Sequence, residues 1–149
     1  MYDRILLPTD GSDTAELAAQ RAIELAARDD AVLHVLYVAE RTRDEPTRTG
    51  LAEKITAELD TGEDVVDEIV ETATEAGLDT DGTVTTGVPR TTIESYADDH
   101  DIGLIVIGST GATDVSEKLL GTVSKYVVNE APADVFIVRP DAVLSDSSE

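Results

Sequence analysis

Four short runs of apolar, largely branched residues constrain what this chain can fold into. They are RILLP, AVLHVLYVA, GLIVIG and DVFIV, at residues 4–8, 31–39, 103–108 and 134–138. None of them alternates apolar with polar side chains, so both faces of each predicted strand are expected to be buried. This pattern is typical of parallel strands that helices cover on both sides. A fifth run, GTVTTG at 82–87, is poor in large apolar groups and predicts a strand near a sheet edge.

Helical patterns separate the predicted strands. Residues 12–30 carry an alanine-rich stripe at helical spacing, with Ser12 as a plausible N-cap. A second pattern spans residues 51–76 and is broken at Gly62, where propensity leaves open whether the helix kinks or is interrupted. Pro89 suits the first position of a third helix. The segment 121–131 predicts the last helix, which ends before a proline.

The order of these patterns predicts an α/β fold. Strands that alternate with helices indicate a doubly wound, five-stranded parallel sheet with helices on both faces and strand order 3-2-1-4-5. We expect one domain over residues 1–140 and a flexible acidic C-terminal tail over residues 141–149. The polar segment 40–50 is predicted to be a loop.

The charge of the chain excludes several classes of partner. Asp and Glu total 32 against 11 Lys and Arg, a formal charge of −21. Such a surface repels nucleic acid and anionic membranes, which attract basic proteins. The acids are spread over every predicted helix, which is typical of proteins that work in concentrated salt; an ordinary acidic cytosolic protein is the alternative. Without cysteine, a secretory signal or a long apolar segment, the chain is predicted to be cytoplasmic.

The predicted topology indicates where a ligand would bind. Open parallel sheets bind ligands beyond the carboxyl ends of their strands, where the strand order reverses. Pro8, Thr9 and Asp10 follow the first predicted strand, Val38 lies near the end of the second, and Gly108 ends the fourth. Asp10 has two interpretations. It is either a local Asx-turn or cap on the following helix, or a carboxylate that accepts hydrogen bonds from ribose hydroxyls or an adenine amine.

The segment GSTGATDVSEKLLGTVS, from residue 108 to residue 124, combines glycines with hydroxyl residues. Gly108 and Gly111 allow a sharp turn that brings backbone amides close to a ligand. Thr122 lies at the predicted start of the last helix, where free amides favour an anion, and Ser124 adds a hydroxyl. Taken alone this is weak evidence for phosphate binding, because ordinary helix caps look the same.

Other chemical motifs are missing from the sequence. It has neither a P-loop nor the GxGxxG of a dinucleotide fold. Two separated histidines without cysteine do not predict a transition-metal cluster, and His100 is expected to be a solvated residue at a helix end. No nucleophile elbow is present. We therefore predict no catalytic residues.

With these motifs in place, the chain resembles the ATP-binding branch of the universal stress protein family. The resemblance covers roughly residues 2–140 and is carried by ILLPTDGS, LHVLYV, GLIVIGSTG and LLGTVSKYVV. The family's glycine motif, G-x2-G-x9-G-[ST], is matched by Gly108, Gly111, Gly121 and Thr122. Together with PTDGS after the first strand, this is a specific combination.

The resemblance implies an adenine nucleotide, ATP or AMP, held beside the first and fourth strands. It places Pro8, Thr9 and Asp10 on the adenosine side and the backbone of Val38 against adenine. The phosphate positions that it implies are Gly108, Gly111, Gly121, Thr122, Val123 and Ser124. Mg²⁺ or Mn²⁺ would be bound through the phosphates, without a metal site on the protein.

The resemblance also implies a homodimer formed through the last strand, at Val135, Phe136, Ile137 and Val138. One departure concerns the phosphate site, because Ala112 and the pair Glu117-Lys118 stand where family members often have basic residues. Lys118 and backbone amides remain, which predicts weaker nucleotide binding or a preference for fewer phosphates. A nucleotide-dependent regulatory module is therefore weighed against two alternatives. These are a nucleotide-free interaction or chaperone-like protein, and a very slow ATPase or phosphotransfer protein, for which no general base or arginine finger is identified.

Overall fold

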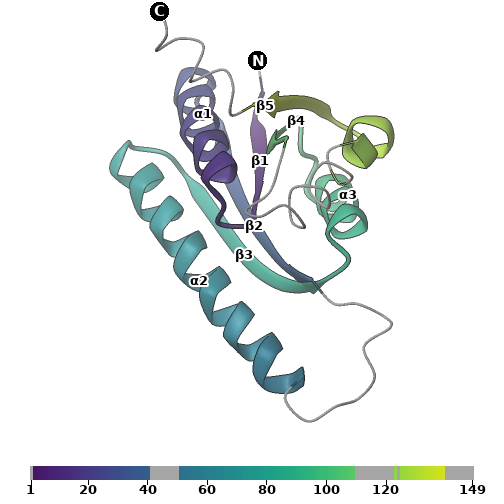
Figure 1. Ribbon diagram of the computed structural model, residues 1–149. Coiled ribbons are helices and arrows are strands. Elements are labelled where there is room, and N and C mark those ends of the chain that lie inside the picture. The colour runs from purple at the N-terminus through teal and green to yellow at the C-terminus, as the bar shows by residue number, and fades with distance from the viewer. Residues whose placement is uncertain (1, 41–50, 110–122, 124, 140–149) are drawn as a thin grey trace, which may run out of the picture.

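Five parallel strands form a single sheet in the computed structural model, in the order β3-β2-β1-β4-β5 (Figure 1). The structure describes residues 2–40, 51–109, 123 and 125–139. The sheet confirms the predicted fold class and strand order. Its strands are β1 (Arg4–Thr9), β2 (Val32–Glu40), β3 (Thr80–Gly87), β4 (Leu104–Gly108) and β5 (Asp134–Val138).

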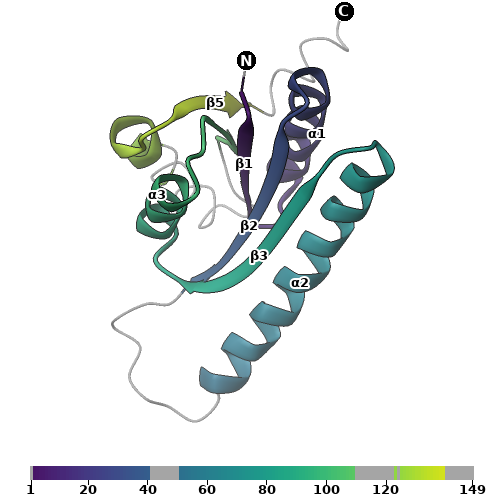
Figure 2. The same cartoon turned by 180° about the vertical axis from the view of Figure 1, so that it is seen from behind.

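Helices cover both faces of the sheet, each over its own apolar core. α1 (Asp13–Asp29) and α2 (Leu51–Glu75) pack on one face, and α3 (Pro89–Asp99) packs on the other (Figures 1 and 2). Residues 125–130 are also helical and lie on the α3 side, where Val127 is fully buried. β1 is enclosed from both sides, as its continuous apolar run predicts. The same expectation for residues 134–138 was wrong, because β5 is an edge strand on which Phe136 and Ile137 are exposed. Within the described residues, no helix is long and apolar enough to cross a membrane.

The alanine stripe of α1 lets this helix lie close to the sheet. Ala18, Ala22 and Ala26 are fully buried against the strands. Ser12 caps the helix as predicted: its hydroxyl oxygen accepts a hydrogen bond from the amide of Ala15 at 3.1 Å. The first turn of α1 therefore begins at a fixed place directly after β1.

α2 runs without interruption through Gly62, which settles the question that propensity left open. A Cβ atom at position 62 would lie 2.5 Å from Cδ1 of Tyr37, which is closer than real Cβ contacts allow. The glycine therefore lets the helix pack directly on the Tyr37 ring and does not break it. This close packing brings Glu58, one turn earlier, to the carboxyl end of the sheet.

His34 occupies a buried position in β2, beneath α3. Its side chain is 2% exposed, and its Nδ1 lies 2.8 Å from the hydroxyl oxygen of Tyr96. The Tyr96 and His100 rings stack at 3.8 Å between centroids. His100 is thus half-buried, and the expectation of a solvated residue was wrong because the end of α3 folds its ring onto Tyr96.

Burial lowers the pKa of His34, while the neighbouring Asp81 acts in the opposite direction. Its Nε2 is buried without a hydrogen-bond partner among the described residues. A proton added to this ring would therefore place a charge in an apolar core. The folded protein should keep His34 neutral at a pH where the unfolded chain already binds the proton.

We predict that His34 lowers the free energy of unfolding as the pH falls below about 6.5, the ordinary pKa of histidine. The unfolded chain takes up the proton first, so this loss approaches about 1.4 kcal/mol per pH unit until the folded pKa is reached. Urea unfolding of the wild type and His34→Leu at pH 7.5 and 5.5 measures it. The carboxylates titrate in the same way in both proteins. Their effect therefore cancels when the change in unfolding free energy between the two pH values is compared. An identical pH response in the two proteins would contradict the prediction.

Candidate functional site

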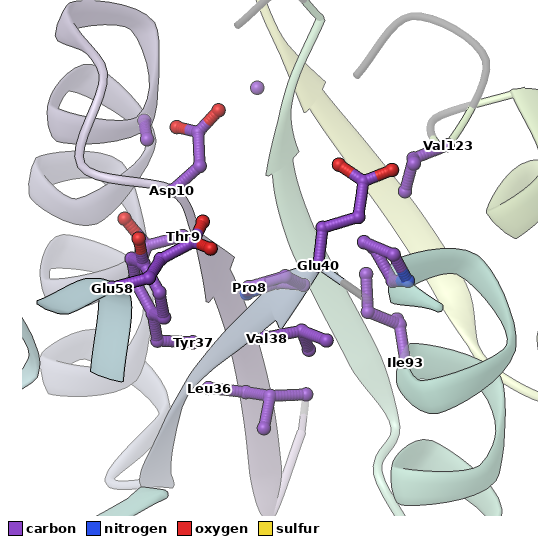
Figure 3. Close-up of a pocket in the computed structure, with 13 residues that line it drawn as sticks. Pro8, Thr9, Asp10, Leu36, Tyr37, Val38, Glu40, Glu58, Ile93 and Val123 are labelled. Carbon is purple, nitrogen blue, oxygen red and sulfur yellow. The ribbon is translucent and has the colours of Figure 1, made fainter. Parts of the chain in front are cut away.

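A pocket of about 170 Å³ opens at the carboxyl ends of the central strands, where the strand order reverses (Figure 3). β1 and β2 form its floor, and α2 and α3 approach from opposite faces of the sheet. Its described lining is Pro8, Thr9, Asp10, Ala15, Leu36, Tyr37, Val38, Glu40, Glu58, Pro89, Ile93, Gly108 and Val123. The pocket thus lies where doubly wound sheets bind ligands.

The structure brings together those site residues of the sequence analysis that it describes. They all line this one pocket: Pro8, Thr9, Asp10, Val38, Gly108 and Val123. The other four lie outside the described residues, so their role stays a prediction: Gly111, Gly121, Thr122 and Ser124. Segments that are a hundred residues apart in the sequence therefore converge on one pocket.

One side of the pocket is an apolar slot. Leu36 and Val38 point from β2 toward the α3 side, and Ile93 approaches them from α3 (Figure 3). Pro8 and Val123 complete the slot, which we define by these five residues. An apolar cavity of about 150 Å³ is enough to hold one benzene ring. The whole pocket, the slot and its polar side together, measures about 170 Å³, and the apolar lining of the slot suits one face of a flat ring.

The turn after β1 fixes the polar rim of the pocket. The Thr9 hydroxyl accepts a hydrogen bond from the Gly11 amide at 3.2 Å, and one Asp10 carboxylate oxygen accepts from the Ser12 amide at 2.9 Å. Gly11 takes a positive φ of 81°, which favours glycine. The local-turn interpretation of Asp10 is thus confirmed. It does not compete with a ligand role, because the exposed carboxylate also lines the pocket.

Gly108 has a packing role at the end of β4. A Cβ atom there would lie 2.9 Å from Cγ2 of Thr14 in the first turn of α1. The missing side chain therefore lets α1 start directly beside β4. This contact places the start of α1 against the end of β4 at the edge of the pocket.

Two carboxylates of the pocket are not among the site residues that the sequence analysis selects, although Glu40 follows Val38 at the predicted end of the second strand. Glu40 ends β2, and Glu58 comes from α2 on the opposite face of the sheet. Burial raises the pKa of Glu40, and the nearby charge of Glu58 raises it further. Glu40 follows Val38 by two residues, so strand alternation could have placed it in the pocket. Nothing in the sequence points to Glu58, because its position depends on the packing of Gly62 against Tyr37.

The described lining of the pocket is acidic. Asp10, Glu40 and Glu58 contribute carboxylates, and none of the described lining residues is basic. Burial raises the pKa of Tyr37, and the charges of Glu58 and Asp10 add to this effect. Among the described residues, no group of three His, Cys, Asp or Glu side chains could hold a metal ion. The described part of the site therefore suits a ligand with an apolar ring and hydrogen-bond donors.

The fold and the pocket define a doubly wound α/β protein with a pocket at its strand switch point. The chain belongs to the universal stress protein family, whose model matches residues 1–139. It is 32% identical over 145 residues to a universal stress protein of Methanocaldococcus jannaschii, a match that covers 93% of this chain and 83% of that protein.

Solved structures show the same architecture. A universal stress protein from Lactobacillus plantarum is 32% identical, with a TM-score of 0.82 over 93% of this chain and 98% of that one. A universal stress protein in complex with cAMP is 25% identical, with a TM-score of 0.71 over 92% of this chain and 97% of that one. The family thus includes a member that binds an adenine nucleotide.

Proposed function

We propose that this protein is a stress-response regulatory protein that binds an adenine nucleotide, ATP or AMP, in the pocket described above. The observation that carries the proposal is the apolar slot beside the Asp10 turn, at the strand switch point. The slot suits a purine ring, and hydroxyls of a ribose can donate to Asp10. The relative of known structure that is in complex with cAMP supports the same class of ligand.

The phosphates belong on the glycine side of the pocket in this proposal. Gly108 and Val123 line the pocket there. The ATP-binding motif adds Gly111, Gly121, Thr122 and Ser124, whose backbone amides and hydroxyls would hold the phosphates. Mg²⁺ or Mn²⁺ would bind through phosphate oxygens and water, the ligands that Mg²⁺ prefers.

The test is to fill the slot. Val38 is half-buried in the pocket wall, so a tryptophan there should occupy the place of the ring without filling the protein core. We predict saturable binding of AMP by the wild type in concentrated salt, and a loss of affinity of at least about tenfold in Val38→Trp. Isothermal titration calorimetry measures both affinities.

Thr72→Trp is the matched control, because Thr72 lies on the exposed face of α2 and outside the pocket. This variant should bind AMP like the wild type, and circular dichroism should show that both variants are folded. Absence of binding by the wild type up to millimolar AMP would overturn the proposed function. Equal affinity of Val38→Trp would place the nucleotide elsewhere.

We further propose that the protein acts as a homodimer formed through β5, with nucleotide occupancy altering the dimer. β5 is an edge strand, and its Phe136 and Ile137 are 38% and 37% exposed; Val128, in the preceding helical segment, is 52% exposed. Val135 is half-buried, and Val138 packs into the core. An apolar edge strand is open to pairing with a second copy, which would cover it.

Ile137→Asp should convert the dimer to a monomer, because each interface would gain two buried, unpaired carboxylates. Size-exclusion chromatography with light scattering gives the mass of each protein. Thr72→Asp on α2 changes the net charge equally and should remain dimeric. A monomeric wild type, or a dimeric Ile137→Asp, would contradict assembly through β5.

We propose that the acidic surface adapts the protein to concentrated salt in the cytoplasm of a halophile. In the described part of the chain, the ion pair found is Arg21–Glu24, at 3.9 Å and largely exposed. Most acidic side chains therefore repel one another through solvent. Salt near 1 M shortens the Debye length to about 3 Å and removes most of this long-range repulsion.

A further inference from the structure

Glu40 holds a position in the pocket that differs from that of the other two carboxylates. It lies on the same face of β2 as Leu36 and Val38, because strand residues alternate between faces. Figure 3 shows its carboxylate above the apolar slot, beside Val123, whereas Asp10 stands across the pocket on the α1 side. Glu40 therefore faces the space that a flat ring would occupy.

The described part of the chain supplies no hydrogen-bond donor to the Glu40 carboxylate. The charged residues that share its pocket are both acidic: Glu58 from α2, which acts on the Glu40 carboxylate, and Asp10 from the end of β1, across the pocket. α3 lines the pocket with Pro89 and Ile93. Asp10 differs, since it already accepts a hydrogen bond from the Ser12 amide. A half-buried carboxylate among like charges is stabilised by any ligand group that donates to it.

We propose that Glu40 reads the base of the nucleotide: its carboxylate accepts a hydrogen bond from the exocyclic amine of a 6-aminopurine ring held in the slot. This inference rests on the nucleotide-binding function proposed above and adds the residue that determines specificity. The ring amine fits Glu40 because Glu40 lies beside the slot, whereas Asp10 lies at the rim, where the sugar would be. A 6-oxopurine presents an acceptor at the same position, which a carboxylate repels.

The ionisation of Glu40 gives this role a second readout. Burial and Glu58 hold the pKa of Glu40 above its ordinary value of 4.5. The proposed hydrogen bond favours the charged form, so binding lowers this pKa and releases a proton. The affinity for AMP should therefore rise with pH through the raised pKa of Glu40. Three other titratable residues face the same pocket, namely Asp10, Glu58 and Tyr37. They are unchanged in a Glu40 variant, so a difference in pH dependence between that variant and the wild type reports on Glu40.

The experiment compares the affinities for AMP and inosine monophosphate, which differ in the group at position 6 of the purine. Wild type, Glu40→Gln and Glu63→Gln are titrated calorimetrically in concentrated salt, at several pH values from 5 to 8. Glu63→Gln removes the same charge from an exposed position of α2 outside the pocket. We expect the wild type and Glu63→Gln to prefer AMP by about tenfold or more, the range for a hydrogen bond to a charged group.

Glu40→Gln should lose most of this preference, because a glutamine amide can donate to an oxo group as readily as it accepts from an amine. Its AMP affinity should also lose the part of the pH dependence that Glu40 causes. A Glu40→Gln protein that keeps the wild-type preference and pH profile overturns the inference, as does a wild type that binds both nucleotides equally. Failure of the wild type to bind either nucleotide overturns the proposed function itself.

Discussion

The structure depends on the parallel pairing of β1 with a strand on each side. β1 pairs with β2 along its whole length, from Arg4 opposite Val32 to Thr9 opposite Tyr37, and with β4 at Ile5 and Leu6. The chain leaves β1 toward β2 and β3 and later returns on its other side as β4 and β5. The crossovers therefore diverge at β1, and a pocket is left outside the carboxyl ends of the strands. The position of the site follows from this topology.

Small residues bring the walls of the pocket together. Gly62 lets α2 lie on the Tyr37 ring, and Gly108 lets α1 begin beside β4. Both glycines are needed because a side chain at either position would clash with its neighbour, and neither takes a positive φ. As a result, acidic side chains from both faces of the sheet meet at one opening, and the apolar slot lies between them and α3. The described part of the pocket therefore offers hydrogen-bond acceptors together with an apolar surface for a ring.

Much of the fold could be predicted because its signals are local. Continuous apolar runs marked the buried strands β1, β2 and β4, although the same pattern wrongly predicted that the edge strand β5 is buried on both faces. The alanine stripe and Ser12 marked α1, and the Asp10 turn followed from one residue type after a strand. The contributions of Gly62, Glu58 and His100 could not be predicted, because each depends on a contact between segments distant in the sequence or on the way α3 ends. The sequence suggested that Gly62 could break a helix, and the Tyr37 ring opposite it explains why the helix continues. Pocket-lining residues were likewise predicted at strand ends that carry motifs, whereas Glu58 was missed because helix packing brings it to the pocket.

The central claim is that the slot defined by Pro8, Leu36, Val38, Ile93 and Val123 holds the purine ring of an adenine nucleotide. A crystal structure of the protein grown with saturating AMP in concentrated salt tests it most directly. The account predicts electron density for the ring between Val38 and Ile93, with the ribose beside Asp10. An empty slot at saturating AMP, or a nucleotide bound at another surface, would contradict it.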